Sequence, residues 1–443
     1  MTCEIRATGS SRSLLAVFVC VVAGLPLGGI GQAPAGASVR GNDVTLHIEN
    51  LGSPFLEMRG SGLLALYRRL ARGKCRDGEW IYARNIWDMH VYDGRVYLGA
   101  GNSSNFPPAV NAGPVPIVCY DPVKENFLKE GTVDDEQIDV YYTHGGRLYI
   151  PGHDPTRSWK LGNFYLRRNN GRWKEYRNIP GAIHTYAMAW HEGKVFGGLG
   201  IHDSAAVSIS ADEGHTWTIV RTGGCRVHGF LAVAGGLYAV EMVPTIKKVE
   251  RWRESLRANF LCVSEFESPD RFIPRRDITA KTLFPTFDSR SSRWMKVIRA
   301  QALGDKTLYI GAYCHNDHQS LPFGLFLASS LERGNPRVRP IVLPDGSRPW
   351  DWVPYDGQVY VLVEAEAAEG ARVKVLRSHA EDLHAWEEVL HFDAPTFARS
   401  FEILDGDFYF GLGCKVDDPP NWKQEELHPA TGDILRVKAE FVK

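Results

Sequence analysis

Two pairs of residues have the side chains that an acid-base site needs. His184 and Tyr186 are two positions apart, and so are Arg226 and His228. Because side chains alternate along a β-strand, the members of each pair should share one face. Histidine can remove a proton, tyrosine can protonate a leaving oxygen, and arginine can neutralise a carboxylate. We therefore predict His184, Tyr186 and His228 as catalytic residues and Arg226 as a substrate-binding residue.

Further charged and aromatic residues recur at matching positions of the chain. Guanidinium groups bind carboxylate or sulfate bidentately, and an indole offers an apolar face to a sugar ring. This combination suits an acidic polysaccharide or oligosaccharide; the alternative is a solvated channel with internal salt bridges. The other predicted substrate-binding residues are Arg299, Arg348, Arg399, Trp87, Trp350 and Asp139.

Thiol and imidazole groups in a second cluster could bind a divalent metal. Cys314, His315 and His318 lie within five residues, and Cys225 lies three positions before His228. Zinc is the metal that prefers such nitrogen and sulfur ligands. The alternative is a disulfide through Cys225 or Cys314, with the histidine pair left as part of a polar rim.

Seven β-hairpins are the elements that would position these residues. A strand, a tight glycine turn and a second strand recur along the chain, with an aromatic residue soon after each turn. Successive aromatic residues are 52, 47, 42, 71, 51 and 49 positions apart, which is typical of propeller blades. The longest step predicts an insertion at 247–257, which we expect to be helical. The aromatic residues are Tyr97, Tyr149, Phe196, Tyr238, Tyr309, Tyr360 and Tyr409.

Two further strands between hairpins complete each unit, so we predict an all-β fold, a seven-bladed β-propeller with four-stranded antiparallel blades. The residues ten and twelve positions before each aromatic residue should then meet at one mouth of the central channel. All the predicted catalytic and substrate-binding residues occupy these positions, and His153 and Asp154 should widen the rim. We expect the turn at Gly304 to be longer than the others. The ring should close by pairing 434–438 with a strand at 80–84, extended by 44–49.

One turn carries a recognised signature. Residues 210–217 fit the pattern S-x-D-x-G-x-T-W, which resembles the Asp box, or BNR repeat, of the sialidase-like propeller superfamily. A degenerate copy is expected at 378–386. The resemblance implies a structural turn between the third and fourth strands of a blade. In such a turn Ser210 and Asp212 bond turn amides and Trp217 packs between blades.

Two reactions and one non-catalytic role fit these residues. The preferred reaction is β-elimination from a uronate-containing glycan, because the site chemistry resembles that of seven-bladed polysaccharide lyases, the ulvan lyases and oligogalacturonate lyases. The second is sialidase-type hydrolysis, implied by the Asp box. That family needs a glutamate beside its tyrosine, and no candidate glutamate faces the ring. The third is a propeller that binds glycans without turnover.

The N-terminus has the layout of a secretory signal. Arg6 and Arg12 precede an apolar run at 14–27, and small residues end at Ala37. We expect 1–37 to be a signal peptide, 38–443 to be a single propeller domain closed by an N-terminal strand, and the protein to be secreted or periplasmic. No other segment is apolar enough to span a membrane. A formal net charge of -1 gives no support for nucleic-acid binding.

Overall fold

The computed structural model describes residues 42–58, 81–103, 111–201, 204–242, 261–286, 294–314, 320–365, 370–414 and 427–442. The predicted signal peptide and the insertion at 247–257 lie outside these ranges. Arg40–Lys443 forms one compact unit. Within the described ranges, no helix has the length and apolar character needed to cross a membrane.

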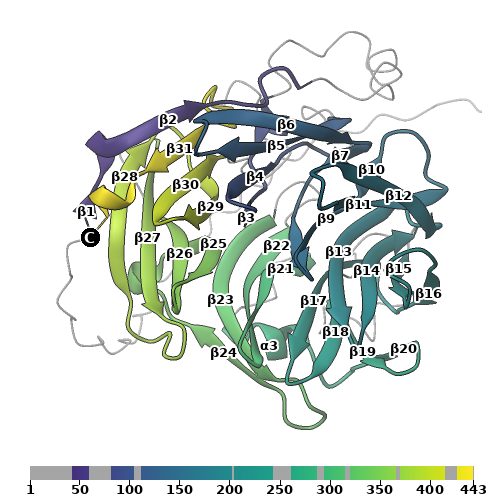
Figure 1. Cartoon of the computed structure of the whole chain (residues 1–443). Helices are drawn as coiled ribbons and strands as arrows, with labels where there is room; N and C mark the ends of the chain where they lie inside the picture. The colour runs from purple at the N-terminus through teal and green to yellow at the C-terminus, as the bar shows by residue number, and fades with distance from the viewer. Residues whose placement is uncertain are drawn as a thin grey trace, which may run out of the picture. The chain divides into compact units, whose positions relative to one another are not determined.

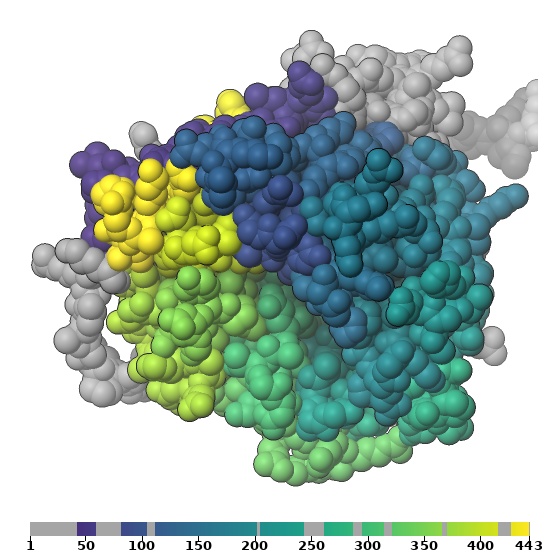
Figure 2. All heavy atoms as spheres, in the orientation of Figure 1, coloured from purple at the N-terminus to yellow at the C-terminus, as the bar shows by residue number. Residues whose placement is uncertain are grey.

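Seven β-sheets follow one another around a ring in chain order, from blue through teal and green to yellow in Figure 1. With the side chains drawn, neighbouring blades pack closely against one another (Figure 2). Each sheet is built on four antiparallel strands. The predicted all-β fold, a seven-bladed propeller, is therefore confirmed.

The strands of the first four blades follow the order in which the chain forms them. The first blade contains β3 (Asp88–Tyr92), β4 (Arg95–Gly99), β5 (Val115–Asp121) and β6 (Asn126–Val133). The second contains β8 (Tyr142–His144), β9 (Arg147–Pro151), β11 (Leu161–Arg167) and β12 (Trp173–Pro180). The third contains β13 (His184–His191), β14 (Lys194–Ile201), β15 (Ser204–Ser210) and β16 (Thr218–Arg221). The fourth contains β17 (Arg226–Val233), β18 (Gly236–Met242), β19 (Leu261–Glu267) and β20 (Arg271–Pro274).

The last three blades include strands from the N-terminal part of the chain. The fifth contains β21 (Trp294–Leu303), β22 (Lys306–Cys314), β23 (Ser320–Ser330) and β24 (Arg337–Ile341). The sixth contains β25 (Arg348–Tyr355), β26 (Gln358–Ala365), β27 (Ala371–His379) and β28 (Glu387–Ala394). The seventh contains β29 (Ala398–Leu404), β30 (Asp407–Leu412), β31 (Ile434–Val437) and β2 (Ile48–Gly52).

A few short elements complete the described part. Two linking strands, β7 (Asp135–Gln137) and β10 (His153–Pro155), extend the sheet of the third blade, and β1 (Asn42–Asp43) pairs in parallel with β28. The short helices are η1 (Thr45–His47), η2 (Tyr82–Arg84), α3 (Ala280–Leu283), η4 (Pro344–Gly346) and η6 (Ala439–Phe441).

The N-terminal strand β2 pairs antiparallel with β31, so strands from both ends of the chain share the seventh blade. The expected strand at 80–84 was wrong, because Tyr82–Arg84 forms the 3-10 helix η2. The expected strand at 44–49 is also displaced, because Thr45–His47 forms η1 and the strand begins at Ile48. The missing fourth strand is thus β2, which overlaps the segment expected only to extend the seam, and not the expected closing strand at 80–84.

The seven repeat aromatic residues are all buried. The largest exposure among them is 7%, at Tyr149 and Tyr360. They also pack between blades, since the Tyr409 ring of the seventh blade lies 5.8 Å from the Tyr120 ring of the first. The spacing that revealed the repeat therefore reflects one core position used seven times.

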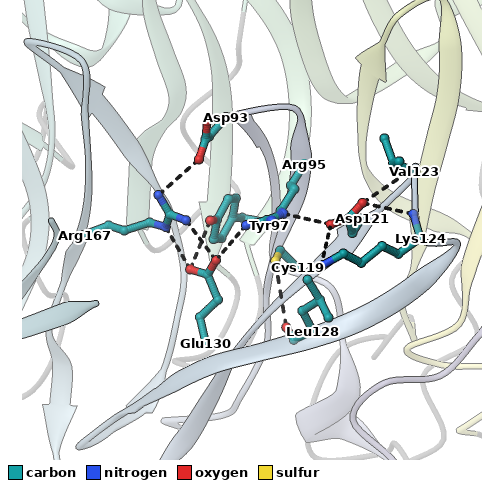
Figure 3. A network of polar contacts seen from close by, with 10 residues as sticks. All are labelled: Asp93, Arg95, Tyr97, Cys119, Asp121, Val123, Lys124, Leu128, Glu130 and Arg167. Carbon is teal, nitrogen blue, oxygen red and sulfur yellow. Dashed lines mark hydrogen bonds and ion pairs between the residues drawn. The ribbon is translucent and has the colours of Figure 1, made fainter. Parts of the chain in front are cut away.

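A polar network joins the first two blades (Figure 3). Glu130, on β6, accepts hydrogen bonds from the Tyr97 hydroxyl (3.1 Å) and from Nε and Nη2 of Arg167 on β11 (2.9 and 3.0 Å). Arg167 also lies 3.4 Å from Asp93 in the first hairpin turn. The repeat aromatic residue of the first blade thus donates a hydrogen bond to Glu130, whose ion pair with Arg167 reaches the second blade.

Residues 210–217 form the turn between β15 and β16, the third and fourth strands of their blade. Ser210 Oγ accepts a hydrogen bond from the Gly214 amide (2.8 Å), and Asp212 accepts one from the Thr216 amide (2.8 Å). Trp217 Nε1 donates to the Asn178 side chain on β12 of the neighbouring blade (3.1 Å). These contacts hold a turn and join two blades.

Candidate functional site

Tyr186 lies at the centre of a cluster of side chains from the third and fourth blades. Its ring stacks on the His184 ring, with centroids 5.0 Å apart and an interplanar angle of 20°, and contacts the His228 ring at 4.2 Å. Arg226 Nε donates a 3.1 Å hydrogen bond to the Tyr186 hydroxyl. The structure therefore brings together the three predicted catalytic residues and Arg226.

β10 adds two residues to this cluster, which we name the Tyr186 cluster. His153 pairs directly opposite His184, and its ring meets the Tyr186 ring edge-on at 4.8 Å. Asp154 Oδ1 contacts Nδ1 of His184. The sequence placed His153 and Asp154 only on the rim, because nothing local in it shows that β10 pairs with β13. Their position just after the second hairpin was the one available signal.

β-Bulges take four central residues of the site out of the strand pairing. Tyr186, His228, Trp350 and Arg399 are each the extra residue where the first strand of a blade shifts its register against the second. A bulge leaves one residue out of the ladder and changes the direction of its side chain, and bulges often occur next to active sites. Strand alternation alone did not predict these bulges or the changed direction of their side chains.

Burial controls the protonation of the Tyr186 cluster. It raises the pKa of Tyr186 well above its ordinary value, although the charge of Arg226 opposes this, so the phenol keeps its proton at neutral pH. Burial lowers the pKa of His228 and of His153, and the positive charge of Lys296 lowers both further. The cluster thus combines a protonated phenol, neutral imidazoles at two positions and a charged guanidinium.

The fifth blade departs from the expected register. Its hairpin closes with a two-residue turn, since Leu303 pairs with Lys306, so the expected longer turn at Gly304 was wrong. The bulge instead lies between Ile298 and Gln301. As a result Val297 is buried in the core, and Lys296 is the cation that acts on His228. Sequence reasoning missed Lys296 for this reason.

Arg299 is held by contacts from two other blades. Its Nη1 contacts Asp88 of the first blade, its Nε lies 3.1 Å from Asp351 Oδ1 of the sixth, and its Nη2 donates to the Trp87 carbonyl. Both carboxylates are only 4% exposed. Burial raises the pKa of Asp351 to about 7, against the effect of Arg299. These contacts make Arg299 a link between three blades.

The remaining predicted substrate-binding residues come from the first, second, sixth and seventh blades. The Arg399 guanidinium lies over the Trp87 ring, 4.0 Å from its centroid, and 5.7 Å from that of Trp350. Burial lowers the pKa of Arg399, and the charge of Asp139 partly opposes this effect. Arg348 is exposed at the start of β25.

Little of the predicted metal site is described. His315 and His318 lie outside the described residues, and Cys314 is described only as the last residue of β22. Cys225 Sγ accepts a 3.5 Å hydrogen bond from Arg226 Nη1. Among the residues that the structure describes, no group of three or more His, Cys, Asp or Glu side chains could hold a metal ion. Zinc binding therefore stays a prediction.

Comparison with known proteins assigns no family. No family model and no curated protein matches the chain. Similar solved structures include YCF48 from Cyanidioschyzon merolae, with 10% sequence identity and a TM-score of 0.42, covering 81% of this chain and 97% of that one. A putative 6-phosphogluconolactonase from Bacteroides uniformis has 9% identity and a TM-score of 0.42, covering 71% and 89%. An α-L-arabinofuranosidase from Clostridium thermocellum has 12% identity and a TM-score of 0.34, covering 70% and 93%. These likenesses are too weak to indicate an activity, so function has to be argued from the site.

Proposed function

We propose that this protein is a secreted or periplasmic polysaccharide lyase that cleaves a uronate-containing glycan by β-elimination. The observation that carries the proposal is the position of Tyr186, which stacks on His184, contacts His228 and accepts a hydrogen bond from Arg226. A lyase needs a base, an acid and a cation within reach of one sugar ring. The Tyr186 cluster offers all three.

Arg226 would bind the uronate carboxylate. Its guanidinium would stabilise the negative charge that develops on the carboxylate when the C5 proton leaves. Because Arg226 already contacts the Tyr186 hydroxyl, a carboxylate bound there would lie beside the phenol. Positioning of this kind makes the reaction effectively intramolecular.

His184 is the better placed of the two candidate bases. Asp154 contacts its Nδ1, and a proton held on that nitrogen by the carboxylate would leave Nε2 free to accept one. His228 has no such carboxylate among its described contacts, and burial together with Lys296 lowers its pKa. We assign His228 to substrate binding beside the ring and His184 to proton removal.

The residues of the Tyr186 cluster would carry out both proton transfers of the proposed elimination. His184 Nε2 takes the C5 proton, the C5–H electron pair forms the C4–C5 double bond, and the bond between C4 and the glycosidic oxygen breaks. Tyr186 then gives its proton to that oxygen. The raised pKa of Tyr186 keeps the phenol protonated until this point. The proton on His184 later returns to Tyr186 through water, which restores both residues.

The test is direct measurement of the unsaturated product. The protein would be incubated with a panel of uronate polysaccharides while the ultraviolet absorbance of the conjugated double bond is followed. We expect turnover to fall by about 10²-fold or more in Tyr186→Phe and in His184→Ala. Tyr355→Phe is the matched control, because Tyr355 lies at the far end of β25 and no contact of its hydroxyl is described; it should keep full activity.

Other outcomes would overturn the proposal. Release of sialic acid without an unsaturated product would indicate hydrolysis instead. Glycan binding without any product would indicate a binding propeller. Equal activity of Tyr186→Phe and Tyr355→Phe would show that the reaction takes place elsewhere.

A further inference from the structure

The two buried arginines at the centre of the ring have very different surroundings. Arg299 contacts two buried carboxylates, Asp88 and Asp351. Arg399 is 7% exposed, yet within the described residues no carboxylate pairs with it and its buried Nε has no hydrogen-bond partner. The charge of Arg299 is thus compensated by direct ion pairs, whereas Arg399 makes no ion pair among the described residues and only the charge of Asp139, which does not contact it, partly compensates it.

Aromatic rings surround the Arg399 guanidinium. Its Cζ lies 4.0 Å from the Trp87 centroid, 5.7 Å from that of Trp350 and 5.9 Å from that of Phe397. The indole NH groups point elsewhere, since Trp87 Nε1 donates to the Gly101 carbonyl and Trp350 Nε1 donates to the Glu364 carboxylate. The two indoles therefore offer only their faces to this position.

Burying the Arg399 guanidinium among aromatic rings costs free energy unless an anion compensates its charge. A buried charge without a hydrogen-bonded partner loses its hydration, and cation–π contacts recover only part of that loss. A guanidinium that keeps free donors is suited to bind an oxyanion from outside. Trp87 is partly exposed and suits contact with the apolar side of a sugar ring, whereas Trp350 is only 3% exposed and packs beside the guanidinium.

We propose that Arg399, together with Trp87 and Trp350, forms an anion subsite for the carboxylate or sulfate of a second acidic sugar unit of the glycan. This inference rests on the proposed function for its substrate. Arg399 belongs to the seventh blade and its two indoles to the first and sixth, whereas the Tyr186 cluster belongs mainly to the third and fourth. In a seven-membered ring these groups of blades lie on opposite sides. The glycan would thus be held at two separate acidic units, and only one of them would be cleaved.

Binding stoichiometry tests this independently of turnover. Sodium glucuronate, glucose 6-sulfate and neutral glucose would be titrated calorimetrically at constant ionic strength. We expect two acidic sugars to bind per wild-type chain and one per Arg399→Met chain, with affinity at the lost site reduced by about tenfold or more. The two acidic probes distinguish a carboxylate subsite from a sulfate subsite, and glucose should bind at neither. Arg271→Met removes an exposed arginine on β20, an outer strand of the fourth blade, and is the matched control, expected to keep both sites.

The stability of the unliganded variants gives a second measurement. Arg399→Met removes a buried charge that makes no ion pair among the described residues, so its melting temperature should equal or exceed that of the wild type. Arg299→Met leaves two buried aspartates without their partner, and its melting temperature should fall. Arg399→Lys keeps the charge without the planar donor pair, and it should retain weakened binding.

The outcomes separate this inference from the proposed reaction. Loss of one anion in Arg399→Met without any lyase product would support the subsite and reject the reaction. Lyase activity with unchanged stoichiometry in Arg399→Met would reject the subsite and keep the reaction. A melting temperature of Arg399→Met as low as that of Arg299→Met, with no change in anion binding, would mean that the chain itself neutralises Arg399 and would overturn the proposal.

Discussion

Replacing Glu130 by glutamine tests how the first two blades are held together. The carboxylate accepts hydrogen bonds from Arg95 Nη1 (3.2 Å), the Tyr97 hydroxyl (3.1 Å), Arg167 Nε and Nη2 (2.9 and 3.0 Å) and Trp173 Nε1 (3.1 Å). Glutamine has nearly the same shape but no charge, and its NH2 group would face these donors. The variant therefore removes the ion pair and leaves the packing in place (Figure 3).

The expected loss of stability follows from the burial of the pair. The Glu130 side chain is 11% exposed and that of Arg167 is 6% exposed. Removing one partner of a buried ion pair costs about 3–5 kcal/mol, and the oxygen that glutamine keeps places Glu130→Gln near the lower end, at about 3 kcal/mol. The control is Asp393→Asn. Its pair with Arg372 is 50% and 42% exposed, so the loss should be below about 1 kcal/mol.

The pH dependence gives the same test a second readout. Burial would raise the pKa of Glu130, but hydrogen bonds from Arg167, Trp173 and Tyr97 outweigh it, and the pKa is lowered. A carboxyl group whose pKa is lower in the folded state stabilises the protein above its unfolded pKa, about 4.3. That stabilisation is lost as the pH falls through the folded value. The difference between wild type and Glu130→Gln should therefore shrink on acidification.

Urea unfolding followed by tryptophan fluorescence, at pH 7 and at about pH 3, measures both effects. The slope with urea should be equal in all three proteins, so that a shift of the midpoint reports stability. If Glu130→Gln loses no more stability than Asp393→Asn, or loses as much at low pH as at pH 7, the reasoning about this ion pair is refuted.

Three further predictions concern the site and the turn beside it. In Gly200→Ala the new Cβ would lie 2.5 Å from Arg226 Cδ and 3.0 Å from His184 Cδ2. These flexible side chains can move away, so the melting temperature should change little. Their displacement from the site should lower lyase activity by about tenfold. Asp154→Asn should lower the turnover number by about 10²-fold with little change in KM, since His184 loses the carboxylate that orients it; a rate equal to wild type would show that Asp154 does not orient the base. Asp212→Ala should lower the melting temperature less than Glu130→Gln does and leave activity intact, and a loss of activity at unchanged stability would contradict a structural role for that turn.

Strand alternation and the repeat predicted the number of blades and several residues of the site. The recurring aromatic residue fixed the number of blades, because a core position must be filled once in every unit. The shared phase of the hairpins also brought His184, Tyr186, Arg226 and His228 to one place. Each inference depended on a local pattern only a few residues long, which the backbone geometry of a strand imposes by itself.

The fifth blade shows what such local patterns do not predict, namely the position of a bulge. A bulge at another position of its first strand buries Val297 and brings Lys296 toward His228. Likewise, nothing near His153 in the sequence shows that its strand pairs with β13. A bulge or an added strand depends on which partner the backbone meets, and that partner is set by the assembled sheet.

The sequence by itself determined the repeat, the seven blades and four members of the Tyr186 cluster, namely His184, Tyr186, Arg226 and His228. Only the tertiary structure decided which arginine makes direct ion pairs, because the partners of Arg299 come from Asp88 and Asp351 on two other blades. An identical residue type at the matching position, Arg399, meets aromatic rings instead. Residue type and spacing are local, whereas the neutralisation of a charge depends on groups more than 200 residues apart in the chain, such as Arg299 and Asp88.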